Sequence, residues 1–160
     1  FNKYYLDQMS IDQLMEVVEL QHFDGSEYSK TVMETIRDRC STLNEFSTNA
    51  DYFFKDPEDY DPSLLLKHCK ENTFNHLSLL KDQLEALEIW EQTYIKEVID
   101  SIVSDLDIGF GKIGLPLRLA LTATVNSPSI DLVCEILGKE ITLRRLENFL
   151  TKIKNLKTDQ

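Results

Sequence analysis

The chain has 160 residues, 42% of them hydrophobic, and its 17 Lys and Arg against 28 Asp and Glu give a formal net charge of −11. That length suits one ordinary domain or two small ones, and it buries a core without a disulfide or a metal. No apolar run approaches the roughly 18 residues of a membrane span, the first ten residues lack the layout of a secretory signal, and an acidic surface disfavours general nucleic-acid binding. We therefore expect a cytoplasmic protein without membrane or DNA contacts.

The spacing of the apolar residues is helical along almost the whole chain. These residues recur at intervals of three and four, and no stretch sustains the alternation of a half-buried strand. Ser10 with Gln13 and Thr42 with Glu45 form capping boxes that mark helix starts. The sequence thus predicts an all-α fold with helices at 10–21, 27–40, 42–54, 62–71, 73–88, 90–106, 115–123, 128–137 and 140–155.

Prolines and glycines mark further helix ends. Asp61 and Ser127 each precede a proline, which places a capping residue before the first helical position. The segment 107–114 carries three glycines and is expected to form a loop, with GFGKIG at 109–114 favoured as a linker over a phosphate cradle. The acidic turn at 55–62 is expected to separate helices rather than domains. Two other glycines can end a helix in the left-handed conformation, Gly25 and Gly138.

The charge divides the chain near residue 111. Residues 1–111 carry 9 basic and 23 acidic side chains, a net of −14, whereas residues 112–157 carry 8 basic and 4 acidic ones, a net of +4. Such a field can steer a polyanion towards the basic end while the acidic turn at 55–62 stays in water. Basic residues that only decorate solvated helix faces explain the same pattern, so charge alone leaves both interpretations open.

The residue types that carry chemistry form no catalytic or metal-binding motif. Cys40, Cys69 and Cys134 fit no disulfide framework and no paired metal-ligand spacing, so we expect buried structural thiols in a reducing compartment. Nucleophile elbows and Walker or dinucleotide loops are absent from the sequence, and solvated helix faces account for the acidic residues. Aromatic residues with acidic or apolar neighbours are expected to pack in the core or between subdomains: Tyr4, Tyr5, Tyr52, Phe53, Phe54 and Trp90.

Residues 112–150 resemble the end of a bacterial glutamyl-tRNA synthetase. The matching features appear in order, as Lys112, Pro116-Leu117-Arg118, Ala120-Leu121-Thr122, Ser127-Pro128, Leu137-Gly138-Lys139-Glu140 and Arg144/Arg145-Leu146. Upstream, IRDRCSTLNEF at 36–46 and FNKYYL at 1–6 resemble further segments of the same family. Each piece alone is weakly specific, whereas the ordered set is specific, and the resemblance extends over essentially the whole chain.

This resemblance implies the C-terminal, anticodon-binding half of a class I aminoacyl-tRNA synthetase. It implies two helical subdomains, a helical cage at 1–75 and a helical bundle at 76–160. The family's N-terminal catalytic domain, with its His-Ile-Gly-His-like and Lys-Met-Ser-Lys-Ser-like signatures, is absent from this sequence. ATP and Mg²⁺ are therefore expected only in the catalytic domain of a parent glutamate–tRNA ligase. We expect this chain to be inactive alone, without a catalytic residue, metal or cofactor.

Arginines are the residues on which the implied RNA contacts depend, because a guanidinium offers a planar fork of donors to cytosine and phosphate acceptors. Arg39 matches the family position that reads the third anticodon base, and Arg37 is the alternative two residues earlier. A surface salt bridge with Asp38 or Glu34 explains either arginine without RNA. The resemblance alone favours a role in recognition.

A second set of implied contacts lies close to the junction of two predicted helices. Arg118 follows Pro116 in the first turn of one predicted helix, and the start of the next exposes backbone N–H groups that favour anions. Simple capping explains the Ser127-Pro128 pair equally well, and both roles can coexist. Ala123 stands where most members of the family have glycine. The positions expected to contact tRNA here, chiefly at the first two anticodon bases, are Arg118, Thr122, Ser127, Pro128 and Ile130.

The implied function is recognition of the anticodon of tRNA(Glu) by a monomer. Whether tRNA(Gln) is also bound depends on how the third anticodon base is treated, and Arg39 favours discrimination. The alternative is an all-helical protein-interaction module with a groove for a partner helix and no RNA binding. A small helical enzyme is a third hypothesis, and it requires two titratable groups that face each other in a pocket.

Overall fold

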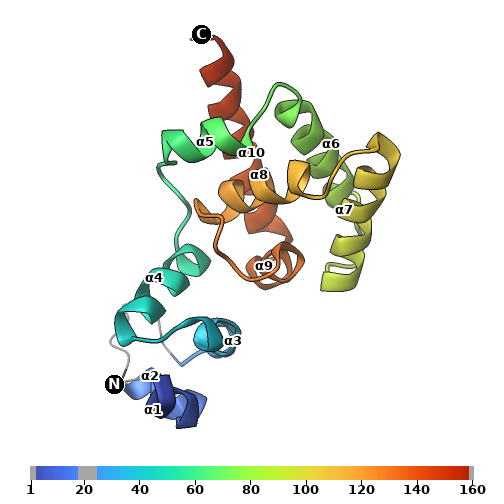
Figure 1. Cartoon of the computed structure of the whole chain (residues 1–160). Helices are drawn as coiled ribbons and strands as arrows, with labels where there is room; N and C mark the ends of the chain where they lie inside the picture. Colours follow the sequence, from blue (N-terminus) through green and yellow to red (C-terminus); the bar gives the residue numbers. More distant parts are fainter. Residues whose placement is uncertain (1–2, 18–24, 159–160) are drawn as a thin grey trace. The chain divides into compact units, whose positions relative to one another are not determined.

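The computed structural model describes residues 3–17 and 25–158, and every regular element among them is a helix (Figure 1). The expected all-α fold is confirmed. The elements are α1 (Lys3–Gln8), α2 (Ile11–Val17), α3 (Glu27–Ile36), the short 3-10 helix η1 (Arg37–Arg39), α4 (Leu43–Phe54), α5 (Pro62–His68), α6 (Thr73–Glu85), α7 (Gln92–Leu106), α8 (Gly111–Thr122), α9 (Ile130–Leu137) and α10 (Lys139–Thr158).

The chain divides into two compact units, Phe1–Lys55 and Asp56–Gln160. The division falls at the start of the acidic turn that the sequence analysis placed between helices rather than between domains. The expected cage at 1–75 and bundle at 76–160 describe functional subdomains, and that assignment stays a prediction.

In the first unit, α3 packs against both α2 and α4. Val32, Met33 and Ile36 lie on one face of α3 and are fully buried, as is Phe46 of α4, while Phe53 of α4 is 2% exposed. Their spacing of three, four and seven residues puts them on a single apolar stripe of each helix. Burying each such side chain stabilises the unit by about 1.5–3 kcal/mol.

Helix caps account for the best-predicted boundaries. Ser10 and Gln13 form the expected reciprocal box, with bonds of 2.9 and 3.2 Å. The Thr42 hydroxyl accepts the N–H of Glu45 at 3.3 Å, but the Glu45 carboxylate accepts the N–H of Ser41 rather than that of Thr42. Asp61 caps α5 with a proline at the first helical position, as predicted.

The second unit is built around α8, which contacts α5, α6, α9 and α10 (Figure 1). From Pro116 to Thr122 every residue of α8 is buried except Arg118, which is half-buried. The longest helix, α10, packs against α6, α8 and α9, and α7 packs against α9. Because the middle of α8 is buried on nearly all sides, its exposed polar groups lie mainly near its two ends.

One additional helix and two shifted helix starts are the differences from the prediction that matter for the fold. The sequence predicts no helix at 3–8, because six residues are too few to show a helical period. Helix α8 begins at Gly111 rather than 115, so Pro116 lies inside it and the expected loop shortens to four residues, 107–110. Helix α9 begins at Ile130 after Ser129, so the predicted cap at Ser127 with Pro128 as first helical residue is wrong. The Ser127 hydroxyl bonds elsewhere, as described below.

The cysteines and aromatic residues follow the prediction in part. Cys40 and Cys134 are buried, and burial raises both thiol pKa values, whereas Cys69 is half-buried with its thiol pKa raised by burial to about 11. Tyr52 and Phe53 are buried. The expectation of packing is wrong for Tyr4 and Tyr5 in α1, which are 65% and 58% exposed.

Candidate nucleic-acid interface

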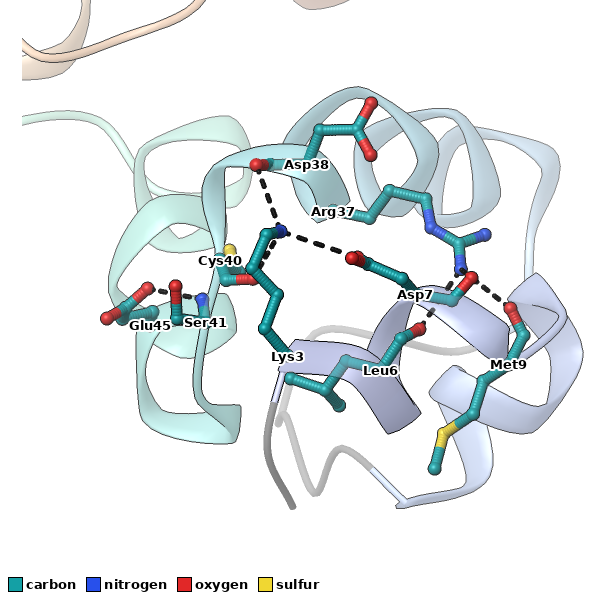
Figure 2. A network of polar contacts seen from close by, with 9 residues as sticks. All are labelled: Lys3, Leu6, Asp7, Met9, Arg37, Asp38, Cys40, Ser41 and Glu45. Atoms are coloured by element: carbon teal, nitrogen blue, oxygen red, sulfur yellow. Dashed lines mark hydrogen bonds and ion pairs between the residues drawn. The ribbon is translucent and has the colours of Figure 1, made fainter.

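Arg37 is a structural residue of the first unit. Its Nη2 donates to the backbone carbonyls of Leu6, Asp7 and Met9, at 3.1, 3.4 and 2.6 Å, so it satisfies the open C-terminal end of α1 (Figure 2). The alternative, a surface salt bridge with Asp38 or Glu34, is not among the ion pairs of the described residues. Backbone carbonyls take the place of a carboxylate, and the Arg37 guanidinium is committed to them.

Arg39 differs from Arg37 in having no such partner. It is exposed at the end of η1, and no hydrogen bond or ion pair joins its side chain to another residue in 3–17 or 25–158. The carbonyls beside it are taken by Lys3, whose Nζ donates to Asp38 and Cys40 at 3.4 and 3.5 Å (Figure 2). Lys3 of α1 thus holds the end of η1, and Arg37 joins the start of η1 to α1. The Arg39 guanidinium remains available to a ligand.

The second group of predicted residues meets at the loop between α8 and α9. Arg118 projects from α8 and its Nε donates to the Ser127 hydroxyl at 3.0 Å, while Nη2 lies 3.5 Å from the Pro128 carbonyl. The Ser127 hydroxyl in turn donates to that same carbonyl at 3.0 Å. A guanidinium has five N–H donors, so this arrangement orients Arg118 and leaves Nη1 without a partner among the described residues.

Thr122 and Ala123 form the tight turn that opens this loop. The Thr122 hydroxyl lies 2.7 Å from the Arg118 carbonyl and 3.0 Å from the Thr124 carbonyl, and it accepts the Thr124 N–H at 3.3 Å. Ala123 ends α8 in the left-handed conformation, with φ 59° and ψ 15°. That conformation favours glycine, which agrees with the residue that the resembling family usually carries here.

Burial separates the predicted contacts into two groups. Thr122, Ser127, Pro128 and Ile130 are buried, so their side chains shape the loop from within. Arg118 is half-buried, and its Nη1 has no partner among the described residues. Asn126, which the sequence analysis did not single out, is exposed within the loop, and its backbone N–H is held by the Thr124 hydroxyl at 3.2 Å.

A buried arginine of α10 bonds to the backbone of α8 just before this loop. Arg145 of α10 is 2% exposed, and its Nη1 donates to the Leu121 carbonyl at 2.7 Å, one residue before Thr122. Its Nε donates to Asp56 at 2.9 Å, and Arg144 grips the same carboxylate through Nε and Nη2 at 2.8 and 2.9 Å. The bonds from Arg144 and Arg145 hold the pKa of the Asp56 carboxyl below its usual range.

The segment that follows Asp56 contacts α8 and α10. The Tyr60 hydroxyl donates to the Ala120 carbonyl at 3.2 Å, and its ring packs edge-on against Phe149 at 5.0 Å. Lys152 donates to the Glu58 carbonyl and lies 5.0 Å from the centre of the Tyr60 ring. Burial raises the pKa of Tyr60 to about 12. The expectation that Asp56 stays in water is therefore wrong, although Glu58, Asp59 and Asp61 are exposed.

Comparison with known proteins places this arrangement in a family. A profile described as "Anticodon binding domain" matches residues 9–150. The chain belongs to the anticodon-binding domain family. The region matched includes both arginines of η1, the loop between α8 and α9, and Arg145, so every candidate residue lies within the anticodon-binding domain.

Two solved structures share the fold of this anticodon-binding domain. One is a glutamate–tRNA ligase from Elizabethkingia meningosepticum in complex with its amino acid, with a TM-score of 0.82 and 24% identity. The other is a glutamate–tRNA synthetase from Elizabethkingia anophelis, with a TM-score of 0.78 and 23% identity. Each covers 94% of this chain but only 31% and 30% of the matched chains, so this chain spans about a third of their length.

The basic end of the domain is less free for RNA than its net charge implies. Arg144 and Arg145 are bound to Asp56, and Lys139 donates to the Leu87 carbonyl at 2.6 Å. The excess of positive charge at 112–157 therefore serves partly to hold the anticodon-binding domain together. Arg118 and Lys112 are the predicted basic features here that keep donors open among the described residues.

Arg145 is the important residue to which sequence reasoning assigned no role. Its spacing from Thr142, Leu146 and Phe149 places it on the buried face of α10, and a buried guanidinium needs a carboxylate. The sequence therefore indicates that Arg145 is buried and paired, but it does not identify the partner, because Asp56 lies 89 residues away. The described residues hold no group of His, Cys, Asp and Glu suited to a metal ion, and none of their helices is long and apolar enough to span a bilayer.

Proposed function

We propose that this chain is the anticodon-binding part of a glutamyl-tRNA synthetase and that it recognises the anticodon of tRNA(Glu). The observation that carries the proposal is the loop at 123–129, where Ser127 and the Pro128 carbonyl orient the Arg118 guanidinium and leave donors open. Membership of the anticodon-binding family and the fold shared with two glutamate–tRNA ligases support it.

The first two anticodon bases are assigned to this loop. RNA specificity resides mainly in unpaired bases, which can be splayed out and hydrogen-bonded along their edges. Arg118 supplies a planar donor fork, and the buried Thr122, Ser127, Pro128 and Ile130 fix the backbone from which it acts. Because Ser127 and Ile130 are buried, we assign their influence on the bases to the loop backbone and to Arg118.

The third anticodon base is assigned to Arg39. Its guanidinium is exposed and free of partners among the described residues, whereas Arg37 is committed to the end of α1. Arg39 is thus the better supported of the two candidates for base recognition. A planar donor fork at the third base favours discrimination between tRNA(Glu) and tRNA(Gln), because the choice between these two tRNAs depends on how the third anticodon base is read.

The rest of the proposed assembly concerns a whole protein about three times as long as this chain. In that protein a separate catalytic domain would bind ATP and Mg²⁺ and attach glutamate to tRNA, and the residues described here take no part in that step. The subdomain limits 1–75 and 76–160, a monomeric state and a cytoplasmic location complete the proposal.

The test combines variants of the chain with variants of the RNA. Affinities of wild type, Arg118→Ala and Arg39→Ala are measured by filter binding with tRNA(Glu) transcripts that carry the native anticodon or one replaced base. A lost base contact is worth about 1–3 kcal/mol by analogy with paired readout in DNA. Arg118→Ala should abolish the preference at the first or second base alone, and Arg39→Ala the preference at the third base alone.

Lys96→Ala is the matched control, because Lys96 is an exposed cation of α7 paired with Asp100 at 2.7 Å. This variant should leave every anticodon preference intact. Equal losses for all transcripts in Arg118→Ala and Arg39→Ala would mark both as phosphate contacts. The absence of any salt-sensitive tRNA binding by wild type would favour the protein-interaction module.

A further inference from the structure

A cavity of about 450 Å³ opens at the other end of α8, away from the Arg118 loop. It is bounded by the end of α5, the start of α6 and the glycine-containing segment before α8. Its lining includes three lysines and two histidines against one glutamate, in a chain whose overall charge is −11. The cationic members are Lys67, Lys70 and Lys112, and the histidines are His68 and His76.

The lysines of this cavity are not neutralised by carboxylates. Lys67 and Lys112 are exposed, and neither forms a hydrogen bond or an ion pair with any residue in the described ranges. Lys70 donates once, to the Leu66 carbonyl at 3.0 Å, and an ammonium group has three donors. By contrast, four other lysines of the second unit each contact a protein acceptor: Lys81, Lys96, Lys139 and Lys152. Three lysines gathered around one cavity against a single glutamate are suited to an anionic ligand.

The backbone around the cavity adds to the positive potential. Helix α6 and helix α8 both begin at its wall, at Thr73 and Gly111, and neither start has a side-chain cap. The N–H groups of Thr73, Lys112 and Ile113 in these first turns bond to backbone carbonyls, so the backbone contributes here through the helix dipoles, which favour negative charge at a helix start. A side chain at Gly109 would meet no atom within 4 Å, so the segment leaves open space beside Lys112. The volume suits a group of nucleotide size.

We propose that this cavity binds a backbone phosphate of the tRNA whose anticodon is read at the other end of α8. The inference rests on the proposed function and adds a contact that carries no sequence information. Lys112 and Thr122 are ten residues apart on one helix, about 15 Å along its axis. Stacked nucleotides rise about 3.4 Å each, so four or five of them connect the two ends. One helix thereby sets the distance between base recognition and phosphate binding.

Neutralising the cavity lysines tests this assignment in the full chain. Lys67→Ala and Lys112→Ala should each weaken binding of a tRNA(Glu) transcript about two- to fivefold at low salt. Each should also lower the slope of log affinity against log salt by somewhat less than one unit, because one contact fewer releases counterions. The loss should be equal for native and altered anticodons. Lys96→Ala removes the same charge from α7 and should change neither affinity nor slope by a comparable amount.

The outcomes separate this inference from the proposed function. If Lys67→Ala and Lys112→Ala bind as wild type does while wild type still prefers the native anticodon, the phosphate site is wrong and anticodon recognition stands. A loss of anticodon preference in either variant would also overturn it. Titration with inorganic phosphate, followed by the amide shifts of Gly109 and Gly111, tests the other source of this chemistry. Shifts with free phosphate combined with unchanged tRNA binding would assign the cavity to a small phosphorylated ligand.

Discussion

Removal of the Asp56 carboxylate should destabilise the second unit far more than removal of its exposed neighbours. Arg145 is 2% exposed and donates to Asp56 at 2.9 Å, so Asp56→Ala removes a carboxylate partner from a buried guanidinium. Breaking a buried ion pair costs about 3–5 kcal/mol. The Asp56 side chain is 33% exposed, so water can partly replace it, and we expect a loss of about 2–3 kcal/mol.

Urea unfolding followed by tryptophan fluorescence measures this loss. Trp90 is the single tryptophan and lies in the second unit, where its Nε1 donates to the Cys134 carbonyl at 2.8 Å. Asp59→Ala is the matched control, because Asp59 is exposed and forms no ion pair with a described residue. We expect it to change the free energy of unfolding by less than about 0.5 kcal/mol. Equal stability of Asp56→Ala and Asp59→Ala would refute the role given to Arg145.

The same pair predicts a pH dependence. The pKa of Asp56 is lower in the folded chain than its usual value, so the unfolded state takes up a proton first as the pH falls. The stabilisation by Asp56 is therefore complete above the usual aspartate range and is lost as the pH falls through the lowered pKa. The stability difference between wild type and Asp56→Asn should shrink in acid. A difference that stays constant down to strongly acidic pH would contradict this assignment.

Three further predictions concern the loop, the first unit and the activity of the whole chain. Ala123→Gly should stabilise the second unit by about 0.5–1 kcal/mol in urea unfolding. A non-glycine residue at φ 59° is strained by about 1–2 kcal/mol, and part of the gain from removing this strain is lost because glycine increases the entropy of the unfolded chain. A destabilisation would show that the turn is not left-handed. Arg37→Ala should speed amide exchange throughout α1, with a loss of about 1.5–3 kcal/mol for its charge-assisted bonds, whereas Arg39→Ala should leave exchange unchanged. Purified chain should give no glutamate-dependent pyrophosphate exchange, and detectable exchange would overturn the assignment to a binding part.

The elements that the sequence predicted well are those whose signals are local. A capping box joins residues three apart, so Ser10 with Gln13 could be found by inspection. The apolar period likewise placed α3, α4, α6 and α7 close to their observed limits. Proline gave one right start, at Asp61-Pro62, and one wrong start, because Ser127 bonds to Arg118 instead of capping a helix.

The contacts that define the candidate site are long-range, and this is why sequence reasoning resolved them only in part. The acceptors of Arg37 lie 28 to 31 residues away, so its commitment to α1 could not be distinguished from the freedom of Arg39. Arg145 and Asp56 are 89 residues apart. The Arg118 and Ser127 pair was nominated by resemblance, and its nine-residue separation becomes a contact only when the loop folds back on α8.

The measurement that tests the central claim most directly is the affinity of the wild-type chain for an isolated anticodon stem-loop of tRNA(Glu), compared with stem-loops of identical stem and length whose three anticodon bases are replaced in turn. At fixed salt, each replacement should weaken binding by about 1–3 kcal/mol, roughly five- to 150-fold. Because stem and charge are constant, phosphate contacts cancel from the comparison. Equal affinity for all the stem-loops would contradict anticodon recognition by this chain.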